Sequence, residues 1–147
     1  MTRELRSVRT EAEIYELVQS FEACTFPLGC WNHREHLTVA VWYLRRLPPE
    51  KAIDRMRLGI RRFNTRHGVQ VTQESGYHET LTVFLVRKIS MILKRLDPNA
   101  PLPAVIEQVC RKLSDWRAVV REHYSRARIM SWEARRGWME PDLKPVE

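Results

Sequence analysis

The sequence has few cysteines and few glycines, and it contains no long uninterrupted hydrophobic run. The three cysteines, Cys24, Cys30 and Cys110, form no C-x-x-C pair, which argues against a disulfide framework and a thiolate zinc site. The apolar stretches are interrupted by Arg or Lys, and the amino terminus lacks the hydrophobic region of a secretory signal. These absences predict a cytoplasmic protein with no membrane-spanning segment.

Several motifs of known enzyme classes are also missing. The chain has no glycine-rich phosphate loop, no G-x-S-x-G, no H-E-x-x-H and no pair of Glu-x-x-His motifs. An ordinary zincin helix and a ferritin-like di-iron bundle are therefore excluded as models for this chain.

The net charge of +7 indicates an anionic partner, but the basic residues are spread along the chain as helical faces. Aromatic residues are not interleaved with the basic runs, as stacking on nucleic acid bases would require. Binding of nucleic acid through Arg57, Arg61, Arg62 and Arg66 is therefore the least favoured of three hypotheses.

The spacing of the hydrophobic residues predicts helices and no strands. Thr10 and Glu13 are expected to form a capping box at the start of the first helix. The expected helices cover residues 11–24, 31–47, 49–67, 76–96, 103–113 and 114–125, with a short helix after 131. Those at 31–47 and 76–96 are very apolar and are expected at the centre.

The predicted fold class is all-α. We expect a single-domain helical bundle of about five to seven helices over residues 1–147, with 139–147 as an extended C-terminal tail. A length of 147 residues is enough for one domain with its own core. A monomer and a homodimer are both compatible with this composition.

Four of the five histidines occupy positions that the helical pattern turns toward the interior. His33 and His36 lie three residues apart and project from one side of their helix. His67 ends one apolar row and His78 begins another. A buried imidazole must be hydrogen-bonded, charged or bound to a metal, so backbone carbonyls and helix ends are the ordinary alternatives for each of them.

A returning helix at 49–67 would bring all four histidines to one end of the bundle. Three neutral imidazoles and an open position match catalytic zinc, and imidazoles with a carboxylate suit iron or manganese. The sequence therefore predicts a divalent metal, zinc first, bound by His33, His36 and His78. His67 is expected to be a fourth ligand or a polar partner.

Glu79 and Tyr77 are the predicted catalytic residues. Glu79 would be a ligand or a general base acting on metal-bound water, whose pKa the metal lowers, and Tyr77 would position a substrate. The favoured function is a metal-dependent enzyme with Lewis-acid or hydrolytic chemistry on a small molecule. The second hypothesis is a metal-free helical module whose imidazoles line a pocket for a small ligand, for instance an anionic one.

Four motifs support a family resemblance. They are W-x-H-x-x-H-L at 31–37, H-G-V at 67–69, S-G-Y-H-E-T at 75–80 and E-P-D-L-K-P at 140–145. With these motifs the chain resembles a family of small, uncharacterised bacterial all-helical proteins. The resemblance spans most of the chain and implies a helical fold, but it implies no activity. A looser likeness to damage-inducible helical-bundle metalloproteins with three histidine ligands rests on architecture alone, without a shared motif.

Overall fold

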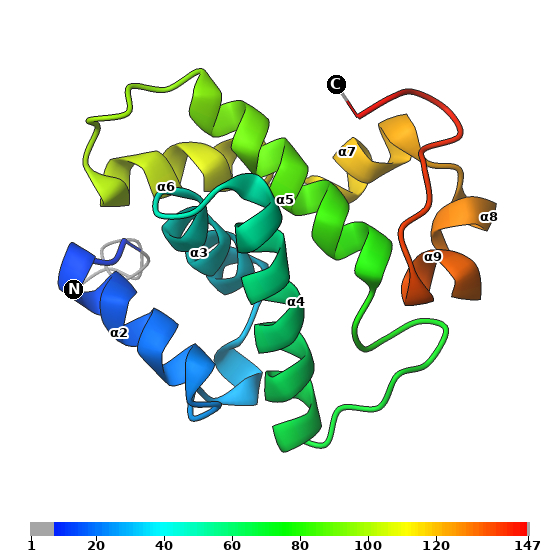
Figure 1. Cartoon of the computed structure of the whole chain (residues 1–147), viewed down its shortest axis with the longest axis horizontal. Coiled ribbons are helices and arrows are strands. Elements are labelled where there is room, and N and C mark those ends of the chain that lie inside the picture. Colours follow the sequence, from blue (N-terminus) through cyan, green and yellow to red (C-terminus); the bar gives the residue numbers. More distant parts are fainter. Residues whose placement is uncertain (1–7, 147) are drawn as a thin grey trace.

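The computed structural model describes residues 8–146, which form helices joined by loops without any strand in that range (Figure 1). A short 3₁₀ helix, η1 (Leu28–Cys30), precedes the second of the α-helices. The α-helices are α2 (Glu11–Glu22), α3 (His33–Leu44), α4 (Pro49–Arg66), α5 (Glu79–Lys94), α6 (Leu102–Lys112), α7 (Trp116–His123), α8 (Arg126–Ile129) and α9 (Trp132–Arg136). The predicted all-α class is confirmed. Residues 1–7 and 147 of the predicted domain lie outside the described part.

The described part contains eight α-helices, so the expected range of five to seven was too low. The additional helix is α8, whose four residues carry no apolar periodicity that the sequence pattern could reveal. Side-chain caps start α8 and α9, because Ser125 accepts a hydrogen bond from the Arg128 amide and Ser131 accepts one from the Ala134 amide.

Caps also set the first residues of the longer helices. The Thr10–Glu13 capping box at α2 is confirmed, with its two hydrogen bonds at 2.9 and 3.2 Å. The helices α3 and α5 begin later than expected, at His33 and Glu79, because the preceding residues Asn32 and His78 have extended backbone and act as N-caps.

The two very apolar helices lie at the centre, as the sequence predicts. Helix α3 packs against α2, α4, α5 and α6, while α5 packs against α3, α4, α6 and α9. Helix α4 runs downward in Figure 1, and α5 returns upward beside it. The main core includes fully buried Phe21, Val39 and Phe63, and a smaller cluster of Phe84, Val120 and Tyr124 joins α5 to α7.

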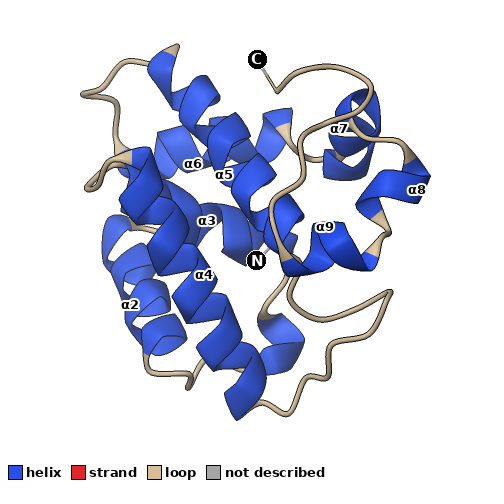
Figure 2. Cartoon of the chain, turned by 45° about the vertical axis from the view of Figure 1, so that its right-hand side comes forward, coloured by secondary structure: helices blue, strands red, loops and turns tan. Residues whose placement is uncertain are grey.

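The segment after α9 contains no helix up to residue 146 and packs back on α7 and α5 (Figure 2). The Tyr124 hydroxyl donates to the Met139 carbonyl at 2.6 Å, and the Leu143 amide donates to the His123 carbonyl at 3.0 Å. Thr80 of α5 donates to the Gly137 carbonyl at 2.7 Å. These bonds hold α7, α8 and α9 beside the start of α5.

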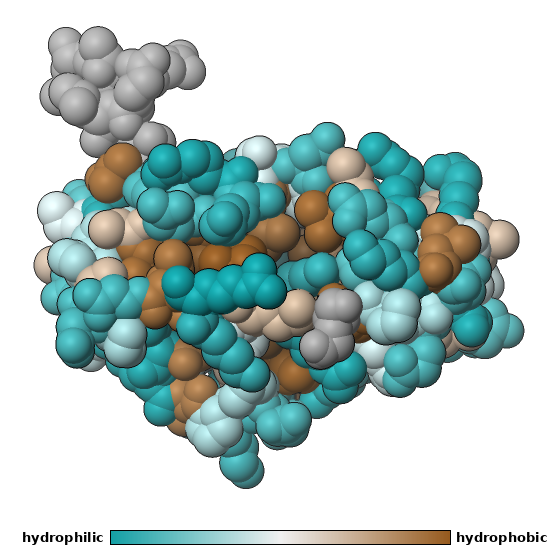
Figure 3. Space-filling model, turned by 90° about the horizontal axis from the view of Figure 1, so that it is seen from above, coloured by the Kyte–Doolittle hydropathy of each residue, from teal (hydrophilic) through white to brown (hydrophobic). Residues whose placement is uncertain are grey.

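Among residues 8–146, no helix has both the length and the apolar character needed to cross a membrane. The face seen from above in Figure 3 is covered mainly by hydrophilic side chains, with hydrophobic areas between them. The largest exposed hydrophobic side chains, which include Leu58 and Leu143, come from different elements.

At Gly59 the backbone of α4 lies close to the Phe21 side chain of α2. A Cβ atom at this position would lie 2.5 Å from Cε2 of Phe21, whose side chain is fully buried and cannot move into solvent. We expect Gly59→Ala to lower the free energy of unfolding by about 1 kcal/mol, because overpacking costs more than the gain in helix propensity returns. Urea denaturation measures this change. Gly29→Ala is the control, since its Cβ would meet nothing within 4 Å, and equal losses in both variants would contradict the close approach.

Candidate functional site

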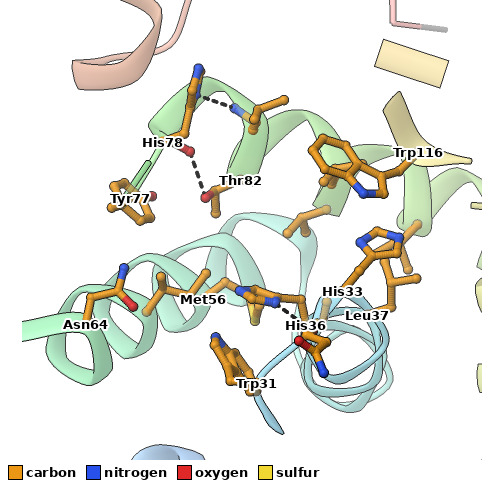
Figure 4. Close-up of a pocket in the computed structure, with 18 of the residues that line it drawn as sticks. Trp31, His33, His36, Leu37, Met56, Asn64, Tyr77, His78, Thr82 and Trp116 are labelled. Atoms are coloured by element: carbon orange, nitrogen blue, oxygen red, sulfur yellow. Dashed lines mark hydrogen bonds between the residues drawn. The ribbon is translucent and has the colours of Figure 1, made fainter. Parts of the chain in front are cut away.

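A pocket of about 480 Å³ lies between α3, α4, α5 and the start of α7 (Figure 4). Its walls are mainly apolar and include Leu37, Ala40, Met56, Ile60, Leu85 and Ile89. A few polar side chains interrupt these walls, among them His33, His36, Asn64 and Thr82. The size and the lining are those of a small-molecule site.

His33 and His36 reach the pocket from the first turn of α3, where their spacing puts them on one side of the helix. The His33 Nε2 donates to the Leu113 carbonyl at 3.0 Å, and the His36 Nδ1 donates to the Asn32 carbonyl at 2.9 Å. Because a carbonyl only accepts, each of these nitrogens carries the proton. The His33 Nδ1 and the His36 Nε2 have no hydrogen bond within the described residues and keep a lone pair for a ligand.

His78 lines the same pocket, but both of its ring nitrogens are occupied. The Nε2 donates to the Ile129 carbonyl at 2.8 Å, and the Nδ1 accepts from the Leu81 amide at 3.1 Å as the N-cap of α5. The ring is therefore held as the neutral Nε2–H tautomer. In Figure 4 its nitrogens are directed away from His33 and His36. This arrangement leaves His78 no lone pair for a metal ion.

His67 does not line the pocket. It is the C-cap of α4, its ring packs on Phe63 at 4.3 Å between centroids, and its buried Nε2 has no hydrogen-bond partner in the described part of the chain. Three of the four predicted metal ligands therefore share one pocket and the fourth does not. Within residues 8–146, no group of three or more His, Cys, Asp or Glu side chains is placed to hold a metal ion. The predicted zinc ligand set is thus not assembled in this arrangement.

Glu79 is buried, lies outside the lining of the pocket and is bound on both carboxylate oxygens. Arg57 donates to it through Nε at 3.0 and 3.1 Å and through Nη2 at 2.6 Å. The Tyr77 hydroxyl donates to its Oε1 at 2.6 Å. Burial alone raises the pKa of Glu79, but the hydrogen bonds from Arg57 and Tyr77 outweigh it and lower the pKa below its usual value.

This pairing argues against the catalytic roles predicted for Glu79 and Tyr77. A carboxylate held by a guanidinium and a hydroxyl is a poor base, because both partners stabilise its charged form. Tyr77 does line the pocket, but its hydroxyl is committed to Glu79. Burial, and then the hydrogen bond to Glu79, raise the pKa of Tyr77 far above its ordinary value, so the phenol stays protonated at neutral pH.

The polar groups of the pocket are almost all uncharged. Burial is the largest influence on His33, His36 and His78, and it lowers the pKa of each below 6.5. The one formal charge among the described lining residues is on Arg117, which is exposed and lies over the ring of Trp116 at 4.5 Å. Trp116 in turn stacks on His33, so this charge lies at the His33 end of the pocket.

Trp31, Trp116 and Asn64 are not among the catalytic residues and metal ligands predicted from the sequence. All three line the pocket. Trp31 belongs to the W-x-H-x-x-H-L motif just before α3, so its nearness to His33 and His36 in the sequence could have indicated that it lies at the site. Trp116 is the first residue of α7 and is distant in the sequence. Only the packing of α7 against His33 reveals its place.

Arg135 holds the loop that brings Tyr77 and His78 to the pocket. Its buried guanidinium donates to the carbonyls of Gln73, Ser75, Gly76 and Tyr77 at 3.0 to 3.2 Å. One side chain from α9 therefore binds four carbonyls of an irregular segment, including that of buried Tyr77, which has no helical partner. The wall formed by this loop is thus fixed by a residue far from it in the sequence.

Comparison with protein-family models, with curated proteins and with solved structures finds no match to this chain. The resemblance to small bacterial helical proteins therefore stays an expectation from the motifs.

The neutral histidines predict a dependence of stability on acid. A folded-state pKa below 6.5 means that the unfolded chain binds protons that the folded chain does not, so the free energy of unfolding falls as the pH falls below about 6.5. Each such histidine changes the free energy of unfolding by at most about 1.4 kcal/mol per pH unit. We expect His78→Asn to reduce this slope, because Asn keeps an N-cap acceptor but does not titrate. Urea denaturation between pH 5 and 8 measures it, and an unchanged slope would contradict a neutral buried His78.

Proposed function

We propose that this protein binds a small, largely apolar molecule in the pocket between α3, α4 and α5, and that it does so without a metal ion. The observation that carries the proposal is a pocket of about 480 Å³ with mainly apolar walls and a few polar groups whose hydrogen-bonding capacity is unused. Such a combination favours an apolar ligand body oriented by one or two polar contacts.

The metal-dependent enzyme is the second candidate. The observation in its favour is that His33 and His36 line one pocket and each keep an unprotonated ring nitrogen. Two imidazoles supply fewer ligands than the three that a catalytic zinc site takes from protein. Binding without a metal needs no rearrangement of His78, and for that reason we place it first.

Three of the four basic residues proposed for nucleic acid binding have partners inside the chain. Arg57 pairs with Glu79 and Asp54, Arg61 lies 4.9 Å from the ring centroid of Tyr77, and Arg62 donates to the Glu22 carbonyl at 3.5 Å. These contacts give the row on α4 a structural use. The contacts therefore weaken the hypothesis that these residues bind nucleic acid.

A cytoplasmic location forms part of the proposal. All three cysteines are free, and Cys24 is buried while Cys30 is exposed. An exposed free thiol suits a compartment that keeps cysteines reduced.

A variant that fills the pocket tests the binding function. The probe is anilinonaphthalene sulfonate, whose fluorescence increases in an apolar site. We expect saturable binding to the wild type and at least an about tenfold loss of affinity in Leu85→Trp, because the larger ring occupies the pocket. Leu58→Trp is the matched control, since Leu58 is 57% exposed on α4 and lies outside the lining. Equal affinities in the two variants, with unchanged near-ultraviolet circular dichroism, would refute binding in this pocket.

Elemental analysis separates the two candidates. Protein purified without a polyhistidine tag is compared with His33→Ala and His78→Asn after incubation with zinc and removal of the excess. We expect no stoichiometric zinc in any of the three proteins, because the described residues assemble at most two free imidazoles in the pocket. One zinc per chain in the wild type, lost in both variants, would instead establish the metal site with His78 as a ligand.

A further inference from the structure

Trp31 places an unpaired hydrogen-bond donor at one end of the pocket. Its side chain is 8% exposed, and its buried Nε1 has no partner among the described residues. The ring is fixed by stacking on Phe21, at 4.5 Å between centroids, and by contact with Phe63 at 5.2 Å. It therefore cannot turn to find an acceptor within the protein. A phenyl ring would fill this space without leaving a buried donor unsatisfied, so the indole N–H calls for another explanation.

His36 supplies an acceptor beside this donor. The rings of Trp31 and His36 lie 4.3 Å apart between centroids, and the His36 Nε2 is unprotonated because the Nδ1 donates to Asn32. In Figure 4 the indole nitrogen of Trp31 points upward toward His36, and Asn64 lies on the same side of the pocket. The Asn64 amide adds a donor and an acceptor to the wall. This end of the pocket thus offers a donor and an acceptor side by side.

The same end has no charged side chain among the described lining residues, since Arg117 lies with Trp116 at the His33 end. A carboxylate placed here would meet the lone pair of the His36 Nε2, and no cation would balance it. A hydroxyl group suits both partners, because its oxygen accepts from an N–H and its proton is donated to a ring nitrogen.

Building on the small-molecule binding proposed above, we infer that the ligand is an uncharged, hydroxyl-bearing molecule with an apolar body. Its hydroxyl oxygen accepts from the Trp31 Nε1 and its hydroxyl proton is donated to the His36 Nε2. The apolar body lies along the wall that includes Met56, Ile60 and Ile89.

Three probes with one ring system test this assignment: naphthalene, naphthol and naphthoate, the last two substituted at the same ring position. Each is titrated into isotope-labelled full-length protein and followed by proton–nitrogen NMR, in which the Trp31 indole signal is assigned by its absence from Trp31→Phe. We expect naphthol to bind roughly fivefold to tenfold more tightly than naphthalene and to move the Trp31 indole proton downfield. Trp31→Phe should abolish this preference, and Trp116→Phe, at the other end of the pocket, should retain it.

The outcomes distinguish this inference from the binding function on which it rests. Equal binding of naphthol and naphthalene, or tightest binding of naphthoate, would overturn the hydroxyl assignment and leave the pocket as a binding site. Failure of all three probes to bind at millimolar concentration would overturn both. If Trp31→Phe does not fold, the ratio of the naphthol and naphthalene affinities in the wild type decides the question.

Discussion

The ion pair between the buried carboxylate of Glu79 and the partly exposed guanidinium of Arg57 is the interaction on which the candidate site depends. It joins the middle of α4 to the first residue of α5, and these two helices form opposite walls of the pocket. A buried carboxylate is tolerated only when its charge is compensated, and here a guanidinium and a phenol do so. The pair accordingly ties the first residue of α5, which follows the N-cap His78, to the middle of α4.

Around that pair, buried polar side chains form hydrogen bonds with the backbone of loops and with the last residue of the short helix α8. His78 binds the carbonyl of Ile129, Thr80 binds that of Gly137, and Arg135 binds the loop before α5. An irregular segment carries carbonyls that no helix satisfies, so side chains must supply the donors. In this region of the chain, chemistry-bearing residue types therefore serve structure first. Trp31 and His36 differ from them because part of their hydrogen-bonding capacity stays unused beside a cavity.

The sequence predicted the fold and the region of the candidate site better than it predicted the hydrogen bonds within that site. Helical periodicity is a local property, so it identified the all-α class, the two central helices and the side of α3 that carries His33 and His36. The turn of the chain through α4 brought His78 to the same pocket. The short helix α8 was not predicted, because its four residues show no hydrophobic period and its stability depends on the Ser125 cap and on contacts with distant residues. The ion pair of Glu79 was not anticipated because its partner Arg57 lies in another helix, and no spacing in the sequence indicates that two such residues meet.

By itself the sequence determined which segments are helices, where most of them start, and that several imidazoles are withdrawn from water, because these properties depend on residues within one or two turns. Only the tertiary structure decided that the Nε2 of His33 and the Nε2 of His78 are occupied, because Leu113 and Ile129 are remote from them in the sequence, whereas His36 binds the Asn32 carbonyl within one helical turn. A ring nitrogen that meets a carbonyl from a distant segment, as in His78 and Ile129, becomes a structural donor, whereas one that meets a cavity, as in His36, is left for a ligand. Hydrogen bonding between segments remote in sequence thus decided that the Nε2 of His78, a predicted metal ligand, is bound to the backbone, which spacing within one helix does not indicate.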